Sequence, residues 1–276
     1  MRLGYNTSGF AFHTLGDALL VISEIGYKVA AVTIEKGVLD PPDSRGVAGA
    51  VSAIRDATAD VPLPVTIETG SRFLLDPRRK HQPTLLSGDA EARQRRFDFL
   101  RAAIEIAAEV SADSVSLWSG RSDDDAGEDE LWGRLVGGVR SLAEYASARG
   151  VRLAFEPEPE MFIDTMEKFE RLLLDVNHRA LGLTLDVGHV HCLGDGAVET
   201  QILQWRNVLW NVHIEDMRRG VHEHLPPGEG EMDFAAVFSA LRETGYAGPI
   251  HVELSRHSHD AVIVARRAFE FLSRFL

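Results

Sequence analysis

Short hydrophobic runs rich in valine, isoleucine and leucine alternate along the chain with longer segments whose apolar residues recur at helical spacing. This alternation is typical of βαβ units, in which a helix carries the chain from one parallel strand to the next. Eight such units follow one another, with strands predicted at about 2–6, 28–34, 64–68, 114–118, 151–156, 181–186, 210–215 and 250–254. The pattern therefore predicts an α/β fold built on a parallel sheet.

The predicted helices fill the intervals between these strands, and their apolar residues lie on one face. Examples are predicted at about 17–24, 47–57, 164–176 and 197–205, around the stripe of Phe97, Leu100, Ile104 and Ala107, and around Val262, Ala265, Phe269 and Leu272. Asp233 has the position of an N-cap for a further helix. No linker rich in proline or serine interrupts the series, and the 276 residues suit a barrel that normally takes about 250. We therefore expect one domain over 1–276 with the (β/α)8 TIM-barrel fold.

Two long loops are predicted, at 69–88 and 216–232. Loops of this length in compact domains usually serve a function. The first carries the basic run Arg78-Arg79-Lys80-His81, which either holds a phosphate or carboxylate of a small substrate or is simply a solvated loop. The second is rich in proline and glycine. We expect it to cover a site, with His222 and His224 reaching inward, the alternative being a passive surface loop.

The strand predicted at 181–186 shows how side chains divide between two faces. Its three leucines share one parity, while Gly182, Thr184 and Asp186 share the other, and successive residues of a strand point to opposite faces. In a barrel one parity meets the helices and the other faces the interior, so Asp186 ends its strand facing inward, at the mouth where barrel active sites form. Asp186 is therefore a candidate metal or substrate ligand, the alternative being that it caps the following helix.

Three other strands end in the same way, because the same parity turns Glu156, His213 and Glu253 inward. Carboxylates that point into one mouth repel one another and raise their pKa values unless a cation neutralises them. Carboxylates together with an imidazole favour Mn²⁺, Mg²⁺, Co²⁺ or Zn²⁺. We therefore predict that Glu156, Asp186, His213 and Glu253 bind one divalent metal ion. The alternative is that each acid is paired separately with an arginine or a helix N-terminus.

Composition and charge narrow the classes of function. The formal net charge of −13 argues against a nucleic-acid partner, because phosphate binding requires a basic face. No apolar run reaches the roughly 20 residues of a membrane span, and the first residues predict a strand and not a signal peptide. The single cysteine, Cys192, excludes an intrachain disulfide and fits a reducing compartment. We expect a cytoplasmic protein without membrane or nucleic-acid partners.

Several motifs at the predicted strand ends, and one in the second long loop, carry a family resemblance that covers nearly the whole chain. They are Glu156-Pro-Glu-Pro159, Leu185-Asp-Val-Gly-His189, Val212-His-Ile-Glu-Asp216, His224-Leu-Pro-Pro-Gly-Glu-Gly230 and Val252-Glu-Leu-Ser255. Together they resemble the xylose isomerase-like barrel superfamily, and within it the sugar phosphate isomerase/epimerase group that includes ketose 3-epimerases and hydroxypyruvate isomerases. The resemblance implies a TIM barrel that binds one divalent metal ion and a small sugar or keto-acid substrate.

The resemblance further implies that Glu156 and Glu253, besides binding the metal, act as acid and base. The reaction would be proton transfer next to a carbonyl through a metal-stabilised enediolate. Return of the proton to the opposite face gives an epimer, and return to the neighbouring carbon gives an aldose–ketose isomer. Loss of hydroxide instead gives a dehydratase.

Substrate contacts are implied as well. The resemblance assigns such contacts to His189, three residues after the metal aspartate, and to Arg219, six residues after His213. The epimerases carry a second glutamate where this chain has Phe162, and Glu158 or Glu160 is its candidate replacement.

Two side chains are candidates for the substrate pocket by position alone. Trp118 lies at the end of the fourth predicted strand and could form a wall of a sugar pocket, the alternative being simple packing. His81 belongs to the basic run of the first long loop, and this run slightly favours an anionic substrate.

Three other functions stay open from the sequence: a dehydratase of the same fold, a noncatalytic metal-binding barrel, and an endonuclease IV-like nuclease. The nuclease would need a cluster of zinc ions with extra histidines such as His189, His222 and His224. It is disfavoured because the fourth predicted strand ends in Ser116 and Trp118 where a further ligand is needed, and because the net charge is wrong for DNA. The exact substrate and the oligomeric state, a homo-oligomer included, are not determined by the sequence.

Overall fold

The computed structural model describes residues 1–36, 38, 46–61 and 63–276. The chain divides into two compact units. Unit 1 comprises residues 1–32, 55–66 and 183–276, and unit 2 comprises residues 33–54 and 67–182. Strands and helices alternate in both units, as the sequence pattern predicts.

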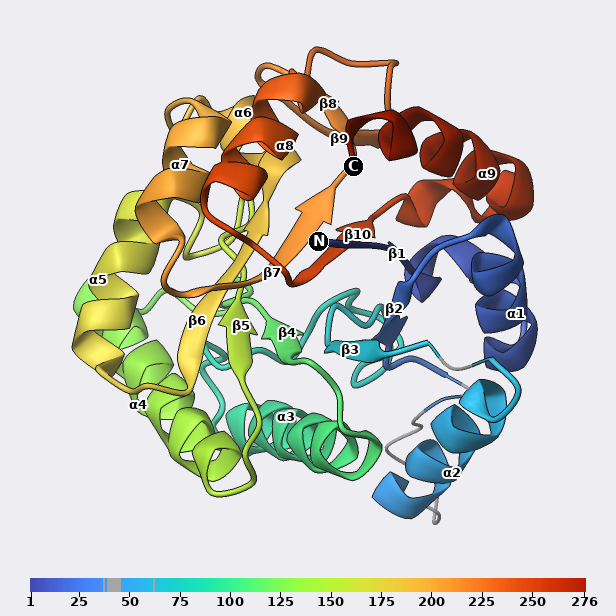
Figure 1. The fold of residues 1–276 in the computed structure, drawn as a ribbon. Helices are drawn as coiled ribbons and strands as arrows, with labels where there is room; N and C mark the ends of the chain where they lie inside the picture. The colour runs from blue at the N-terminus through green and yellow to red at the C-terminus, as the bar shows by residue number, and fades with distance from the viewer. Residues whose placement is uncertain (37, 39–45, 62) are drawn as a thin grey trace. The chain divides into compact units, whose positions relative to one another are not determined.

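The parallel strands that lie wholly or mostly in unit 1 pair in one series (Figure 1). They are β1 (Arg2–Asn6), β2 (Val29–Thr33), β6 (Leu181–Asp186), β7 (Leu209–Ile214) and β10 (Pro249–Val252). Strand β1 pairs with β2 and β10, β10 pairs also with β7, and β7 pairs with β6. The register sets Asp186 and His251 on either side of His213. The ends of β6, β7 and β10 therefore bring side chains of the predicted metal set into one row.

Figure 1 shows α1, α7, α8 and α9 outside the strands of unit 1. The helices of this unit are α1 (Leu15–Ile25), α6 (Val187–Leu193), α7 (Val198–Trp205), α8 (Phe234–Glu243) and α9 (Ala261–Leu272), with 3-10 turns at Thr7–Phe10, Ser255–Asp260 and Ser273–Phe275. Asp233 caps α8 as predicted, because its Oδ1 accepts a hydrogen bond from the Ala236 N–H at 3.0 Å. The buried Tyr27 hydroxyl donates to the Ala265 carbonyl at 2.9 Å, which satisfies the polar end of an aromatic core residue.

Unit 2 repeats the same order of strands and helices. The elements that lie wholly or partly in it are α2 (Gly46–Thr58), β3 (Val65–Glu68), α3 (Ala90–Val110), β4 (Val115–Leu117), α4 (Glu128–Ser147), β5 (Leu153–Phe155) and α5 (Met166–Val176). Strand β4 pairs in parallel with β3 and β5, and α4 packs against α3 and α5. Most of the predicted stripe on α3 is packed, because Leu100, Ile104 and Ala107 are each 1% exposed, whereas Phe97 is only half-buried.

The prediction of a long loop from 216 was wrong for its first half. Residues 216–225 form an antiparallel hairpin of β8 (Asp216–Arg218) and β9 (Val221–Leu225). Gly220 allows the tight reversal, because its φ of 74° is a left-handed value that side chains disfavour. The helix after β6 was predicted only from about residue 197, whereas the short helix α6 begins directly after β6.

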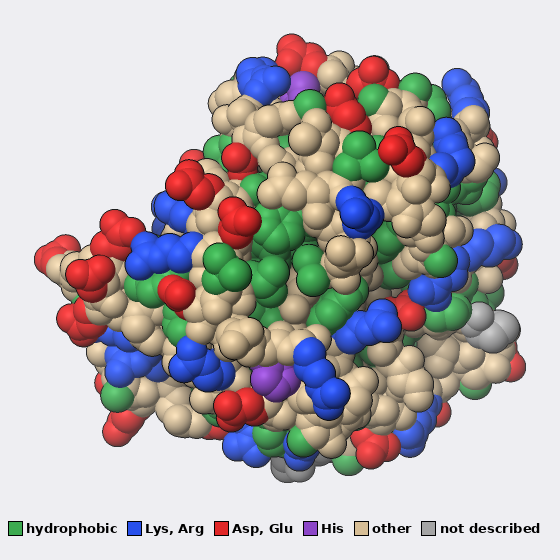
Figure 2. Space-filling model, turned by 60° about the vertical axis from the view of Figure 1, so that its left-hand side comes forward, with side chains coloured by type: hydrophobic (Ala, Val, Ile, Leu, Met, Phe, Trp, Pro, Cys, Tyr) green, Lys and Arg blue, Asp and Glu red, His purple; other side chains and the backbone are tan. Residues whose placement is uncertain are grey.

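The surface carries charges of both signs. Figure 2 shows acidic and basic side chains interspersed over the face that it presents. Some of them pair, as Arg121 does with Glu160 at 2.6 Å, and both side chains are more than half exposed, so such a pair contributes little stability. Among the described residues, no helix combines the length and the hydropathy that crossing a membrane requires.

Candidate metal centre

Asp186 is both the last residue of β6 and the N-cap of α6. Its Oδ1 accepts a hydrogen bond from the His189 N–H at 2.8 Å, whereas its buried Oδ2 has no hydrogen-bond partner. Burial raises the pKa of Asp186, but the neighbouring imidazoles of His189, His224 and His213 outweigh burial and hold the pKa well below its usual value. One oxygen of an ionised carboxylate thus caps the helix, and the other is available to a ligand.

His213, in β7, faces Glu253, which directly follows β10. Nδ1 of His213 lies 3.0 Å from Oε2 of Glu253, and the two side chains are 1% and 22% exposed. Burial raises the pKa of Glu253, but His213 and then His224 lower it to about 2. Glu253 is therefore ionised at neutral pH, which is the form that binds a cation or accepts a proton.

A further carboxylate, Glu215, directly follows β7 and is fully buried. Neither of its oxygens accepts a hydrogen bond from an N–H or hydroxyl group, but its carboxyl shares a hydrogen bond with Asp186, and Oε2 lies 3.6 Å from Nδ1 of His224. Burial and the charges of Asp186 and Glu253 raise the pKa of Glu215 well above its usual value. Gly188 makes room for it, because a Cβ at Gly188 would lie 2.0 Å from the Glu215 Oε1.

Three imidazoles gather beside Asp186: His189 from α6, and His222 and His224 from β9. The Nε2 atoms of His189 and His222 are 3.2 Å apart, and one donor nitrogen from each of the three residues lies within 4.8 Å of the others. Burial lowers the pKa of His189 to about 4, although Asp186 opposes this shift. His189 is therefore neutral at physiological pH, which is the form of imidazole that binds metals.

A buried aspartate anchors the hairpin that carries His222 and His224. Asp216 accepts hydrogen bonds through Oδ1 from the N–H groups of Met217 and Met232, both at 3.0 Å, and through Oδ2 from the Gly228 N–H at 2.8 Å. These bonds tie both ends of the segment to one side chain. As expected from the sequence, both histidines reach inward, and they do so from a fixed hairpin.

The residues present fit a divalent metal ion. Ligand atoms of Asp186, His213 and Glu253 lie within 4.8 Å of one another, as do those of Asp186, Glu215 and His224. Carboxylate and imidazole donors suit Mn²⁺, Zn²⁺ and similar ions. The buried Oδ2 of Asp186, which accepts no hydrogen bond from an N–H or hydroxyl group, carries a desolvation cost, and a bound cation would offset that cost.

Three of the predicted acids lie in unit 2. Glu156 directly follows β5, is 6% exposed, and continues the strand pairing by donating its N–H to the Leu117 carbonyl at 2.8 Å. Glu158 is half-buried two residues later. Glu160, the other candidate replacement for the second epimerase glutamate, is 70% exposed and pairs with Arg121. Its carboxylate is therefore held in a surface ion pair.

Trp118 and His81, the two candidates for the substrate pocket, meet in unit 2 with their ring centroids 5.1 Å apart. Beside them the guanidinium of the buried Arg96 lies 5.0 Å from the Trp118 ring and 5.0 Å from the Phe99 ring. Arg96 also donates to the Thr69 carbonyl at 3.3 Å. Burial lowers the pKa of Arg96 to about 10, and burial together with nearby cationic side chains lowers that of His81 to about 4.

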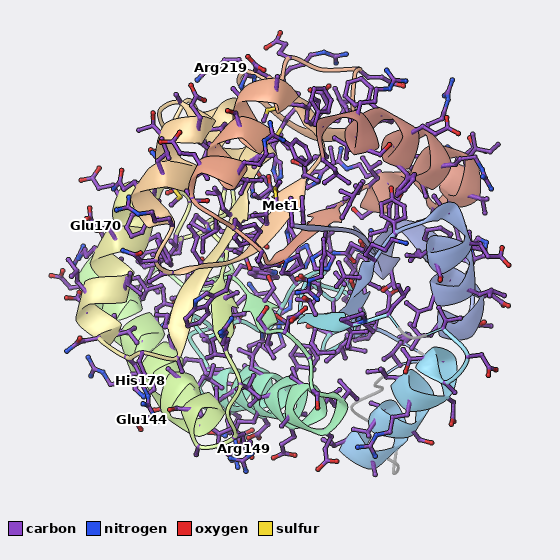
Figure 3. All side chains as sticks on the ribbon, in the orientation of Figure 1. Met1, Glu144, Arg149, Glu170, His178 and Arg219 are labelled. Carbon is purple, nitrogen blue, oxygen red and sulfur yellow. The ribbon has the colours of Figure 1, made fainter. Side chains whose placement is uncertain are left out.

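Arg219 lies apart from the Asp186 cluster. It forms the turn of the hairpin with Gly220, and Figure 3 shows it on the outer side of unit 1, away from the strands. Its backbone N–H donates to Oε2 of Glu231 at 3.0 Å, and its guanidinium lies against Gly194 at the end of α6. A substrate contact by Arg219 stays a prediction.

A family profile described as xylose isomerase-like TIM barrel matches residues 19–275, which is most of the chain. The chain belongs to the xylose isomerase-like TIM barrel family. The family resemblance found in the sequence motifs is thereby confirmed. So is the predicted fold class, a closed parallel (β/α)8 barrel.

Curated relatives of this xylose isomerase-like barrel include two kinds of enzyme. The L-ribulose-5-phosphate 3-epimerase UlaE of Shigella flexneri is 27% identical over 191 residues, which cover 68% of this chain and 66% of the relative. The 3-dehydroshikimate dehydratase of Pseudomonas putida is 26% identical over 239 residues, which cover 83% of this chain and 35% of the relative. The matches thus span just under two thirds of the epimerase and about a third of the dehydratase.

A solved structure described as IOLI protein with a binding zinc atom has the same fold as this chain. It superposes with a TM-score of 0.75 at 18% identity, covering 100% of this chain and 99% of that chain.

Sequence reasoning assigned no role to Glu215 and Arg96 of these clusters, or to Asn211, a buried residue of β7. Glu215 and Asn211 share the inward parity of His213 on β7, so the rule that found His213 also finds them. Arg96 gives no such signal, because its buried position depends on Trp118, which follows another strand, and on the loop residue Thr69.

Proposed function

We propose that this xylose isomerase-like barrel is a divalent-metal-dependent isomerase or epimerase of a small sugar, sugar phosphate or related keto acid. The observation that carries the proposal is the buried cluster of Asp186, His213 and Glu253, which includes a carboxylate oxygen without a hydrogen-bond partner. The 27% identity to an L-ribulose-5-phosphate 3-epimerase supports the reaction class.

The proposed metal ligands are Glu156, Asp186, His213 and Glu253, with Mn²⁺ as the ion we expect. A bound divalent ion would act as a Lewis acid on a substrate carbonyl, which acidifies the neighbouring carbon-bound proton. Glu156 is included because it directly follows β5, much as Asp186 ends β6, because both are buried, and because strand ends meet at one face of a (β/α)8 barrel.

Proton transfer is assigned to the two glutamates. Glu253 is ionised, since its pKa is lowered to about 2, and an ionised carboxylate can take a proton from carbon. Glu156 is the proposed partner that returns a proton from the other side of the substrate. Such general acid and base groups typically contribute about 10²–10⁴ in rate each.

The remaining predicted residues would bind the substrate. His189 lies beside Asp186, with its Nε2 3.5 Å from the Asp186 Oδ2, and is placed to contact a substrate oxygen near the metal. The hairpin that carries His222 would exclude water from this position. We assign Glu158, Trp118, His81 and Arg219 to more distant parts of the substrate.

A dehydratase is the second candidate. The 3-dehydroshikimate dehydratase matches 83% of this chain, against 68% for the epimerase. The same base would remove a proton next to a carbonyl, but a hydroxide would then leave from the adjacent carbon in place of reprotonation.

The test is incorporation of deuterium from solvent into a panel of ketoses, ketose phosphates and hydroxy keto acids. Wild type is compared with Glu253→Gln and with Glu243→Gln, a control on the exposed end of α8. We expect exchange into one substrate class, lowered by about 10²–10⁴ in Glu253→Gln and unchanged in Glu243→Gln. Elimination of water from a substrate would favour the dehydratase, and exchange that survives Glu253→Gln would refute the assignment of the base.

A further inference from the structure

A second row of buried polar side chains lies behind the metal cluster in unit 1. Asn211 in β7 and His251 in β10 are both 0% exposed, and the strand register sets Thr184 beside Asn211 and His251 beside His213. Buried polar groups in a parallel barrel are costly unless they are hydrogen-bonded. The Asn211 amide is the centre of this row.

The amide of Asn211 contacts three side chains. Its Nδ2 lies 3.1 Å from Nε2 of His213 and donates to Oγ1 of Thr184 at 3.4 Å. Its Oδ1 lies 2.9 Å from Nδ1 of His251. Since Nδ2 is a donor, Nε2 of His213 is the acceptor, and Oδ1 accepts from an N–H at Nδ1 of His251.

These contacts define a tautomer of His213. A neutral imidazole whose Nε2 accepts a hydrogen bond carries its proton on Nδ1. That proton then faces Oε2 of Glu253, 3.0 Å away. The row therefore stabilises the form of His213 in which Nδ1, the nitrogen facing Glu253, is protonated.

A cation beside Glu253 requires the opposite arrangement. To bind a metal, Nδ1 of His213 must offer its lone pair, so the proton must lie on Nε2. Two N–H groups would then face each other between His213 and Asn211. The conflict is removed when the amide turns over, because Oδ1 then accepts from Nε2 of His213.

We propose that Asn211 is a positioning residue whose amide turns over when the metal binds, and that His251 changes tautomer with it. After the turn, Oδ1 of Asn211 also accepts from the Thr184 hydroxyl. Nδ2 of Asn211 donates to Nδ1 of His251, which loses its proton to solvent, while Nε2 of His251, an atom without a hydrogen-bond partner in the described structure, takes one up from solvent. Each ring exchanges one proton position for another, so neither gains nor loses charge. The proposal rests on the proposed metal site, and it adds two residues that touch neither metal nor substrate.

The first test uses wild type alone. Protein with ¹⁵N-labelled histidine is compared by NMR without metal and with Zn²⁺, which is diamagnetic. We expect the protons of His213 and His251 to move from Nδ1 to Nε2 when Zn²⁺ is added. Zn²⁺ binding without these changes would overturn this inference and leave the metal site standing, whereas absence of Zn²⁺ binding would overturn the metal site itself and this inference with it.

A matched pair of variants of similar size gives a second readout. Asn211→Asp offers only acceptors and so favours the proton on Nε2 of His213, whereas Asn211→Leu offers nothing. We expect the dissociation constant for Zn²⁺, measured by calorimetry, to stay the same or tighten in Asn211→Asp and to weaken by about 10–100-fold in Asn211→Leu. Equal weakening in both variants would show that Asn211 only fills space.

Discussion

A buried polar cluster in unit 1 and another in unit 2 satisfy their charges differently. In unit 2 the guanidinium of Arg96 lies between the rings of Phe99 and Trp118 and donates to a backbone carbonyl. In unit 1 the ionised carboxylate of Asp186 keeps a buried oxygen that accepts no hydrogen bond from an N–H or hydroxyl group.

This difference separates a cluster whose charge the protein itself stabilises from a candidate metal site. A buried cation between aromatic faces is stabilised by the protein itself. Buried carboxylate oxygens without partners are destabilising in the free protein, and they are retained where a ligand supplies the missing charge. Charge that the fold leaves unsatisfied is therefore a better marker of the metal site than charge alone.

The largest expected effect comes from changing the metal cluster, and it is a loss of metal binding. Asp186→Asn removes a proposed ligand while keeping an oxygen that can cap α6. Wild type at Mn²⁺ 100-fold above its dissociation constant should gain about 2.7 kcal/mol of unfolding free energy. The variant should gain almost none in the same urea titration, and a full gain would remove Asp186 from the ligand set.

The second prediction concerns the satisfied cluster. Arg96→Lys keeps the charge but loses the planar guanidinium that stacks on Phe99 and Trp118. We expect the free energy of unfolding to fall by about 1–3 kcal/mol, while the stabilisation by Mn²⁺ stays that of wild type. Loss of Mn²⁺ stabilisation in this variant would mean that the two clusters are not functionally distinct.

The smallest expected effect is the contribution of His81 to the pH dependence of the unfolding free energy. Burial lowers the pKa of His81 from 6.5 to about 4 in the folded protein, so the unfolded chain takes up the proton first as the pH falls. This contribution to stability is complete above pH 6.5 and is lost as the pH falls towards 4. Urea unfolding at pH 7 and pH 5 should show a smaller loss in His81→Gln than in wild type, and equal losses would contradict the shift.

Much of the fold followed from the sequence because strand parity and helix periodicity are local signals. The same parity identified Asp186, His213 and Glu253, three residues that the structure brings together. The hairpin of β8 and β9 was missed, because its turn has the dipeptide Arg219-Gly220 and lacks an Asn-Gly or Asp-Gly signature. The proximity of His224 to Glu215 was missed for the same reason, because it depends on that turn.

The role of Asp186 shows where single-residue reasoning reaches its limit. The sequence presented helix cap and metal ligand as alternatives. In the structure one oxygen caps α6 and the other has no hydrogen-bond partner. Position on a strand does not determine how the two oxygens of a carboxylate are used, since that depends on α6, which starts at the next residue.

The central claim is that a divalent ion binds at the ends of β6, β7 and β10. The most direct measurement is a crystal structure of the Mn²⁺-loaded protein with anomalous scattering at the manganese edge. We predict an anomalous peak within about 2.0–2.4 Å of Asp186, His213 and Glu253. Fully loaded crystals without a peak at these three residues would contradict the account.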